Sequence, residues 1–206
     1  MSNEKTKVNM DPKYIIKLCL TLCLTCVIVA GLLGGVNAIT ADKIAAINWE
    51  KTVAAMKAVV ADPDATEFSD ALDKTPEMEA AAAAYGSLDS IYEVQVNGAA
   101  AGYAIKVVAS GSQGSIEMMV GVDAEGTVTG VSVVTNAETA GIGSKVMENE
   151  PTAAGVGVLS QFEGKSPADG ELTVGQGIDA ITGATVSTKG VTAGVNAALA
   201  VAAVMG

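Results

Sequence analysis

The sequence predicts an α+β protein in which a single N-terminal transmembrane helix precedes one domain with helices packed on an antiparallel-rich β-sheet. Three observations predict this fold. Residues 18–41 carry no charged side chain, four later segments are rich in Val and Ile, and the C-terminal segment is rich in Ala and Val. These patterns are typical of a membrane helix, of the strands of β-hairpins and of a helix packed on a sheet, respectively.

The uncharged run of residues 18–41 is long enough to cross a bilayer as a helix. Lysines precede it, and this bias predicts that residues 1–17 are cytoplasmic and that residues 42–206 form an extracytoplasmic domain at the cell (inner) membrane. Val36-Asn37-Ala38 resembles a signal-peptide cleavage site, but the apolar run is longer than the core of a signal peptide. We therefore interpret it as a single-pass anchor.

Three cysteines, Cys19, Cys23 and Cys26, lie inside this run. Their close spacing is compatible with a metal ion or an iron–sulfur cluster. The same spacing places the three side chains on one face of a helix, where cysteine behaves as a small apolar residue. We favour the second interpretation.

Four segments after the anchor have helical character. They are residues 44–60, residues 77–85, the C-terminal end of residues 147–162, and residues 187–206. A polar, acidic connection at residues 63–75 separates the first two. The last segment is interrupted by Gly190 and Gly194, so we interpret it as a helix closing the domain and not as a second membrane span.

Four strands are expected, in two hairpins. They lie at residues 90–96, 102–109, 115–122 and 127–134. Asn97-Gly98 joins the first pair and is typical of two-residue hairpin turns. The sequence Asp-Ala-Glu-Gly at residues 123–126 joins the second pair.

The composition excludes several classes of function. The chain of 206 residues contains no His, and its formal net charge is −11. Nucleic-acid backbones are bound by clustered Lys and Arg, so we expect no nucleic-acid partner. Without His, Ser–His and Cys–His catalysis and a His-ligated metal site are impossible. We therefore assign no catalytic residue and no metal site to this chain.

The strongest functional signal is a short segment before the last helix. It reads Asp-Ala-Ile-Thr-Gly-Ala-Thr-Val-Ser-Thr over residues 179–188. Residues 182–185 form a small, flexible stretch with two hydroxyl groups. The free amides at the N-terminus of the following helix favour an anion such as a phosphate. A helix cap formed by Ser187 or Thr188 would explain the same residues without any ligand.

This segment resembles the flavinylation motif of FMN-binding domains. That motif is Asp, two variable residues, Ser or Thr, Gly, Ala, Thr, two variable residues, then Ser or Thr. Its positions here are Asp179, Thr182, Gly183, Ala184, Thr185 and Thr188. In that family a separate, divalent-metal-dependent flavin transferase moves FMN from FAD onto the threonine after Gly-Ala. The resemblance implies that Thr185 carries covalent FMN through a phosphoester, as an attachment point and not as a turnover catalyst.

Residues 136–143, Asn-Ala-Glu-Thr-Ala-Gly-Ile-Gly, resemble another part of the family. The family's loop is usually written His-x-Glu-Thr-Pro-Gly-Leu-Gly, and this chain departs from it at three positions, Asn136, Ala140 and Ile142. The resemblance implies that the loop lines the flavin, with Glu138, Thr139 and Ile142 as contacts.

Two further segments extend the resemblance. Residues 161–165 are similar to a family segment containing Phe-x-Gly-Lys, which implies Lys165 as a flavin contact. Residues 114–123 are similar to the family's Gly-x-Ile-x-x-x-Val-x-x-Asp strand.

Two families of membrane subunits share this architecture. One is the G subunit of the Rnf complex, which couples ferredoxin–NAD electron transfer to translocation of Na+ or H+. The other is the C subunit of the sodium-pumping NADH:quinone oxidoreductase, which is typically longer. This compact chain is more similar to the first. The resemblance implies an electron-relay subunit that is not catalytic alone and that has integral and peripheral partner subunits, including a second FMN-bearing membrane subunit and iron–sulfur subunits.

Two other functions remain compatible with the sequence. A free-standing, membrane-anchored flavoprotein of extracellular electron transfer would carry the same motif. A non-redox anchored binding or adhesion domain would explain the membrane helix and the acidic charge.

Overall fold

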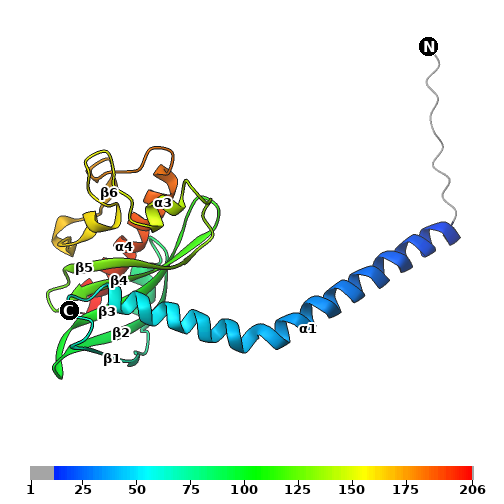
Figure 1. The fold of residues 1–206 in the computed structure, drawn as a ribbon, viewed down its shortest axis with the longest axis horizontal. Coiled ribbons are helices and arrows are strands. Elements are labelled where there is room, and N and C mark those ends of the chain that lie inside the picture. The colour runs from blue at the N-terminus through cyan, green and yellow to red at the C-terminus, as the bar shows by residue number, and fades with distance from the viewer. Residues whose placement is uncertain (1–11, 206) are drawn as a thin grey trace, which may run out of the picture. The chain divides into compact units, whose positions relative to one another are not determined.

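The computed structural model describes residues 12–205. The described chain falls into two compact units, with the boundary between Ile47 and Asn48. The helices and strands, drawn in Figure 1, are α1 (Pro12–Ala58), β1 (Thr66–Ala71), α2 (Pro76–Ala82), β2 (Ser87–Val96), β3 (Ala99–Ser110), β4 (Ser115–Asp123), β5 (Val128–Asn136), α3 (Ser144–Met147), η1 (Leu159–Phe162), η2 (Pro167–Asp169), β6 (Thr173–Val174), β7 (Gly177–Ile178) and α4 (Thr185–Met205). The elements η1 and η2 are short 3-10 helices.

The helix α1 contains the whole uncharged run and is long and apolar enough to cross a membrane. Its threonine hydroxyls donate to carbonyls one turn earlier, as Thr21 does to Lys17 at 2.9 Å and Thr25 to Leu22 at 2.8 Å. These bonds satisfy the hydroxyls within the helix, as an apolar surrounding requires. The helix α4 passes the same test of length and composition, but 67% of its apolar window is buried in the domain, as in a core helix.

The helix expected at residues 44–60 is confirmed as far as Ala58, and it is continuous with the apolar helix before it, because α1 runs without a break from Pro12 to Ala58. Between Gly35 and Ala58 the sequence contains neither Pro nor a further Gly, so nothing there interrupts a helix. The boundary between the two units falls within this helix, and its residues from Asn48 onward belong to the second.

The second unit is built on a five-stranded antiparallel sheet in the order β1-β2-β3-β4-β5. The four predicted strands and the Asn97-Gly98 hairpin are confirmed, and both turn residues have the positive φ that a type I′ turn requires, 53° and 79°. The strand β1 corrects the expectation of an irregular connection at residues 63–75. It is the edge strand, and its short sequence Thr-Glu-Phe-Ser-Asp-Ala is too polar to indicate a strand.

One face of the sheet is covered by α4 (Figure 1). The helix α2 packs against α4 and β2. A Cβ at Gly190 would lie 2.6 Å from the Ser110 carbonyl oxygen, and one at Gly194 would lie 2.6 Å from the Met118 sulfur. These two glycines therefore allow α4 to approach β3 and β4 closely. The close approach brings the first turns of α4 beside the end of β3.

The other face is covered by the last turns of α1, through Ala55 and Met56, and by Val59 directly after the helix. Val59 sits over Gly121 and Gly130, which are cross-strand partners in β4 and β5. Thr129 Oγ1 donates to the Val59 carbonyl at 2.6 Å and satisfies a group that the helix end leaves free.

Candidate cofactor-attachment site

The segment that resembles the flavinylation motif forms a tight turn followed directly by α4. The Ala184 amide donates to the Ile181 carbonyl at 2.9 Å, and Gly183 has φ +86°. A β-turn with positive φ only at its third residue is a type II turn, which favours glycine there. A Cβ at Gly183 would meet no atom within 4 Å, so the requirement is conformational and not steric.

Ala184 anchors the turn to the domain core. Its side chain is 2% exposed and belongs to the main hydrophobic cluster, and its carbonyl accepts the Thr188 amide at 2.9 Å. Since this is the first hydrogen bond of α4, the amides of residues 185–187 have no carbonyl acceptor within the helix. Thr185, the first residue of α4, is exposed. The fold thus fixes the backbone behind Thr185 and leaves its side chain at the surface.

Neither residue considered as a helix cap acts as one. Thr188 is fully buried, and its hydroxyl donates back to the Ala184 carbonyl at 3.0 Å. Ser187 is 2% exposed and donates to Glu138 at 2.6 Å. Thr188 therefore braces the turn from inside the helix, and Ser187 links the helix to a distant loop.

Asp179, at the start of the motif, is held by a side chain that the sequence did not single out. The Asp179 amide donates to Gln161 Oε1 at 2.7 Å, and Gln161 Nε2 donates to the Asp179 carbonyl at 3.0 Å. This pair of bonds fixes the backbone entering the attachment turn and leaves the Asp179 side chain exposed, as is that of Thr182. No sequence signal connects these two residues, which are 18 positions apart, one in η1 and the other directly after β7.

The loop of residues 136–143 lies beside the first turn of α4, because Glu138 receives the Ser187 hydroxyl. Thr139 is exposed and its carbonyl accepts the Ser144 amide at 3.2 Å, while Ile142 is 51% exposed. Val186, next to Thr185, is 57% exposed. Large apolar side chains are thus left open to solvent on both the loop and the helix start, as a flat apolar ligand would use.

Lys165 is not brought to this group. Its carbonyl accepts the Val128 amide at 2.7 Å, at the start of β5, whereas Glu138 follows the end of that strand. An extended strand rises about 3.3 Å per residue, which separates the two ends of β5 by roughly 25 Å.

Close to Lys165, Ser166 donates through its amide and hydroxyl to Asp169, and these bonds hold the pKa of Asp169 below its ordinary value.

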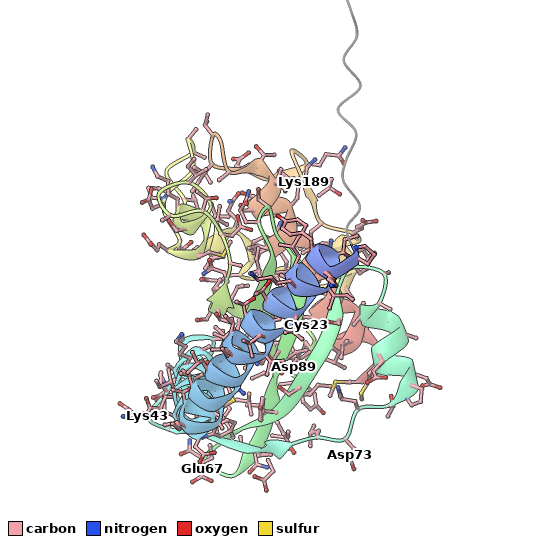
Figure 2. The ribbon with its side chains drawn as sticks, turned by 90° about the vertical axis from the view of Figure 1, so that its right-hand side faces the viewer. Cys23, Lys43, Glu67, Asp73, Asp89 and Lys189 are labelled. Carbon is pink, nitrogen blue, oxygen red and sulfur yellow. The ribbon has the colours of Figure 1, made fainter. Side chains whose placement is uncertain are left out.

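Lys189 is a charged group that the sequence analysis missed. It is exposed and projects from α4 four residues after Thr185 (Figure 2). Residues four apart on a helix are neighbours on one face, so this ammonium lies near whatever Thr185 carries. The four-residue spacing from Thr185 could have indicated this lysine from the sequence. In a domain rich in carboxylates, this places a cation at the start of α4.

The arrangement suits a phosphate ester. An exposed hydroxyl stands at a helix N-terminus, where unpaired amides and the helix dipole favour an anion. A lysine lies one turn away, and exposed apolar side chains flank the hydroxyl. Within residues 12–205, no three His, Cys, Asp or Glu side chains gather as metal ligands.

The described chain is thus a long apolar helix followed by an α+β domain whose last helix begins with an exposed hydroxyl. The family model of the FMN-binding domain matches residues 111–200, which include the loop, the turn and most of α4.

Two relatives cover far more of the chain. The G subunit of the Na(+)-translocating ferredoxin:NAD(+) oxidoreductase complex of Acetobacterium woodii is 34% identical over 209 residues, 96% of each chain. The G subunit of the ion-translocating oxidoreductase complex of Methanosarcina acetivorans is 28% identical over 185 residues, 88% of this chain and 90% of its own. Its counterpart in Aliivibrio fischeri is 44% identical over 57 residues, 27% of each chain. The chain belongs to the family of G subunits of ion-translocating oxidoreductase complexes.

Proposed function

We propose that this chain is the electron-relay subunit of an Rnf-type complex and that it carries FMN joined to Thr185 through a phosphoester. The observation that carries the proposal is the presentation of Thr185, whose side chain is exposed while the residue before it is anchored in the core. A bound FMN supplies one- and two-electron transfer, and the protein supplies its position and its electrostatic surroundings.

The attachment is a group transfer carried out by a flavin transferase. The Thr185 oxygen bonds to the FMN phosphorus of FAD, the bond from that phosphorus to the AMP moiety breaks, and AMP leaves. The hydroxyl proton passes to a base of the transferase. The phosphodiester that remains is an anion at the start of α4, where the helix dipole stabilises it by about 0.3–1 kcal/mol. Lys189 adds a positive charge one turn away.

Partner subunits follow from the proposed topology. Ferredoxin and NAD are cytoplasmic, so a flavin on the outer face of the membrane can be reached only by electrons that cross the bilayer. The sequence has no His, and its cysteines all lie between residues 19 and 26. We therefore expect integral partners, among them a second FMN-bearing subunit and iron–sulfur subunits, to provide the crossing. The coupling ion is Na+ or H+.

The place of this flavin in the electron path is tested in the assembled complex. With Thr185→Val, ferredoxin-driven NAD reduction should fall to the background of membranes lacking the complex, because the relay has lost its cofactor. Thr173→Val, which removes an exposed hydroxyl outside the attachment motif, should leave the rate unchanged. Undiminished activity of the Thr185→Val complex, with its subunits still copurifying, would remove this flavin from the path.

The orientation is tested by cysteine labelling. Glu125 is exposed in the turn between β4 and β5, so Glu125→Cys provides a reactive thiol in a chain whose three native cysteines are replaced by Ala. An outward-facing domain predicts labelling by an impermeant maleimide in intact cells or spheroplasts. Labelling that appears only after lysis would reverse the proposed topology.

A further inference from the structure

We propose that Glu138 is a positioning residue whose carboxylate latches the loop of residues 136–143 to the first turn of α4, and so holds that loop against the flavin. The inference rests on the proposed attachment of FMN to Thr185. The family resemblance implied that Glu138 contacts the flavin directly. In this proposal Glu138 acts instead by holding the loop in place.

The carboxylate joins three segments that are distant in sequence. Oε1 accepts the amides of Ser112 and Gln113, at 2.6 and 3.3 Å, from the turn between β3 and β4. Oε2 accepts the Ser187 hydroxyl at 2.6 Å from α4. Hydrogen bonds to an ionised acceptor are shorter and stronger than neutral ones. Both oxygens are therefore engaged by the protein, at a point two residues from Thr185.

Two glycines leave space for this carboxylate. A Cβ at Gly111 would overlap Oε1, and one at Gly143 would overlap Oε2 and lie 2.9 Å from the Ser187 hydroxyl. Gly143 has an ordinary helical φ of −66°, so its lack of a side chain answers to space and not to backbone conformation. The lack of side chains at Gly111 and Gly143 leaves the space that the Glu138 carboxylate occupies.

The loop that Glu138 holds is braced internally. The Glu138 amide donates to Asn136 Oδ1 at 3.1 Å, and the Gly141 amide donates to the Ser144 hydroxyl at 2.9 Å. Because the loop is tied together in this way, a restraint at Glu138 also restrains Ile142, whose side chain is half exposed. The hydrogen bonds of Glu138 thus determine the position of the Ile142 side chain relative to Thr185.

The test compares Glu138→Gln and Ser187→Ala with Thr129→Ala in the full chain. Glutamine keeps the shape of Glu138, but its NH2 group cannot accept from a backbone amide and can only donate to Ser187. The variant also loses the negative charge that strengthens all of these bonds. Ser187→Ala keeps the backbone bonds and removes only the link to α4. Thr129→Ala loses one side-chain bond to a backbone carbonyl at the far end of β5.

Each variant is measured for covalent flavin by intact mass, and for visible circular dichroism and fluorescence anisotropy of the flavin. We expect flavin on all three. The flavin dichroism of Glu138→Gln should fall at least twofold with a matching loss of anisotropy, Ser187→Ala should change in the same direction, and Thr129→Ala should match wild type. Wild-type dichroism and anisotropy in both latch variants would overturn the latch while leaving attachment intact. A wild-type chain without covalent flavin would instead overturn the attachment, and the latch with it.

Discussion

A Thr185→Val chain, co-expressed with an active flavin transferase, is expected to contain no covalent flavin. Valine has nearly the shape of threonine but lacks the oxygen that forms the phosphoester. Thr185 is exposed at the first position of α4, so the folding free energy should change by no more than about 0.5 kcal/mol. The measurement is flavin fluorescence of the denatured chain on a gel, together with thermal unfolding.

Thr173→Val is the control for this result. Thr173 is also an exposed threonine, but it lies outside the attachment motif. Its variant should give a fluorescent band as strong as that of wild type. A band retained by Thr185→Val would show that the attachment residue has been assigned wrongly.

Gly183→Val should reduce flavin loading by roughly tenfold or more. The residue at this position must adopt φ +86°, which costs a β-branched residue on the order of 1–3 kcal/mol, and 1.4 kcal/mol corresponds to a factor of ten. The chain relieves the strain by changing the turn, and the turn is what presents Thr185 to the transferase. Loading is measured as the flavin-to-protein ratio after a fixed time with transferase and FAD.

Gly155→Val controls for strain in general. Gly155 has φ +81°, and a Cβ there would also meet no atom within 4 Å, but it lies outside the attachment motif. This variant should lose comparable stability and keep its flavin. Loading of Gly183→Val at the wild-type rate would mean that the type II turn does not govern recognition.

The hairpins could be predicted from the sequence because strand residues alternate and Asn-Gly marks the turn. The edge strand β1 could not be predicted, because it pairs with a neighbouring strand on one side only and most of its side chains are polar. The helix α4 was expected from residue 187, and its actual start at Thr185 makes the attachment residue part of the helix. That difference decides the local electrostatics of the site.

The links around the site were beyond the reach of sequence patterns. The bond from Ser187 to Glu138 spans 49 residues, and the pair of bonds between Gln161 and Asp179 joins η1 to the segment after β7. Neither pair follows a helical or strand period, so only the folded chain reveals them. For Lys165 the sequence was misleading. Its segment resembles a family segment, but the Lys165 backbone is bonded to the start of β5, whereas the site lies beyond the end of that strand.

The attachment of FMN to Thr185 can be tested by mass spectrometry of the peptide that contains this residue. The chain is expressed with its transferase, digested and fragmented without reduction of the flavin. We expect the peptide to be heavier by the mass of FMN less one water, with fragments placing the addition on Thr185. An unmodified peptide, from cells in which the same transferase loads a known acceptor, or an FMN placed on Thr182, would contradict it.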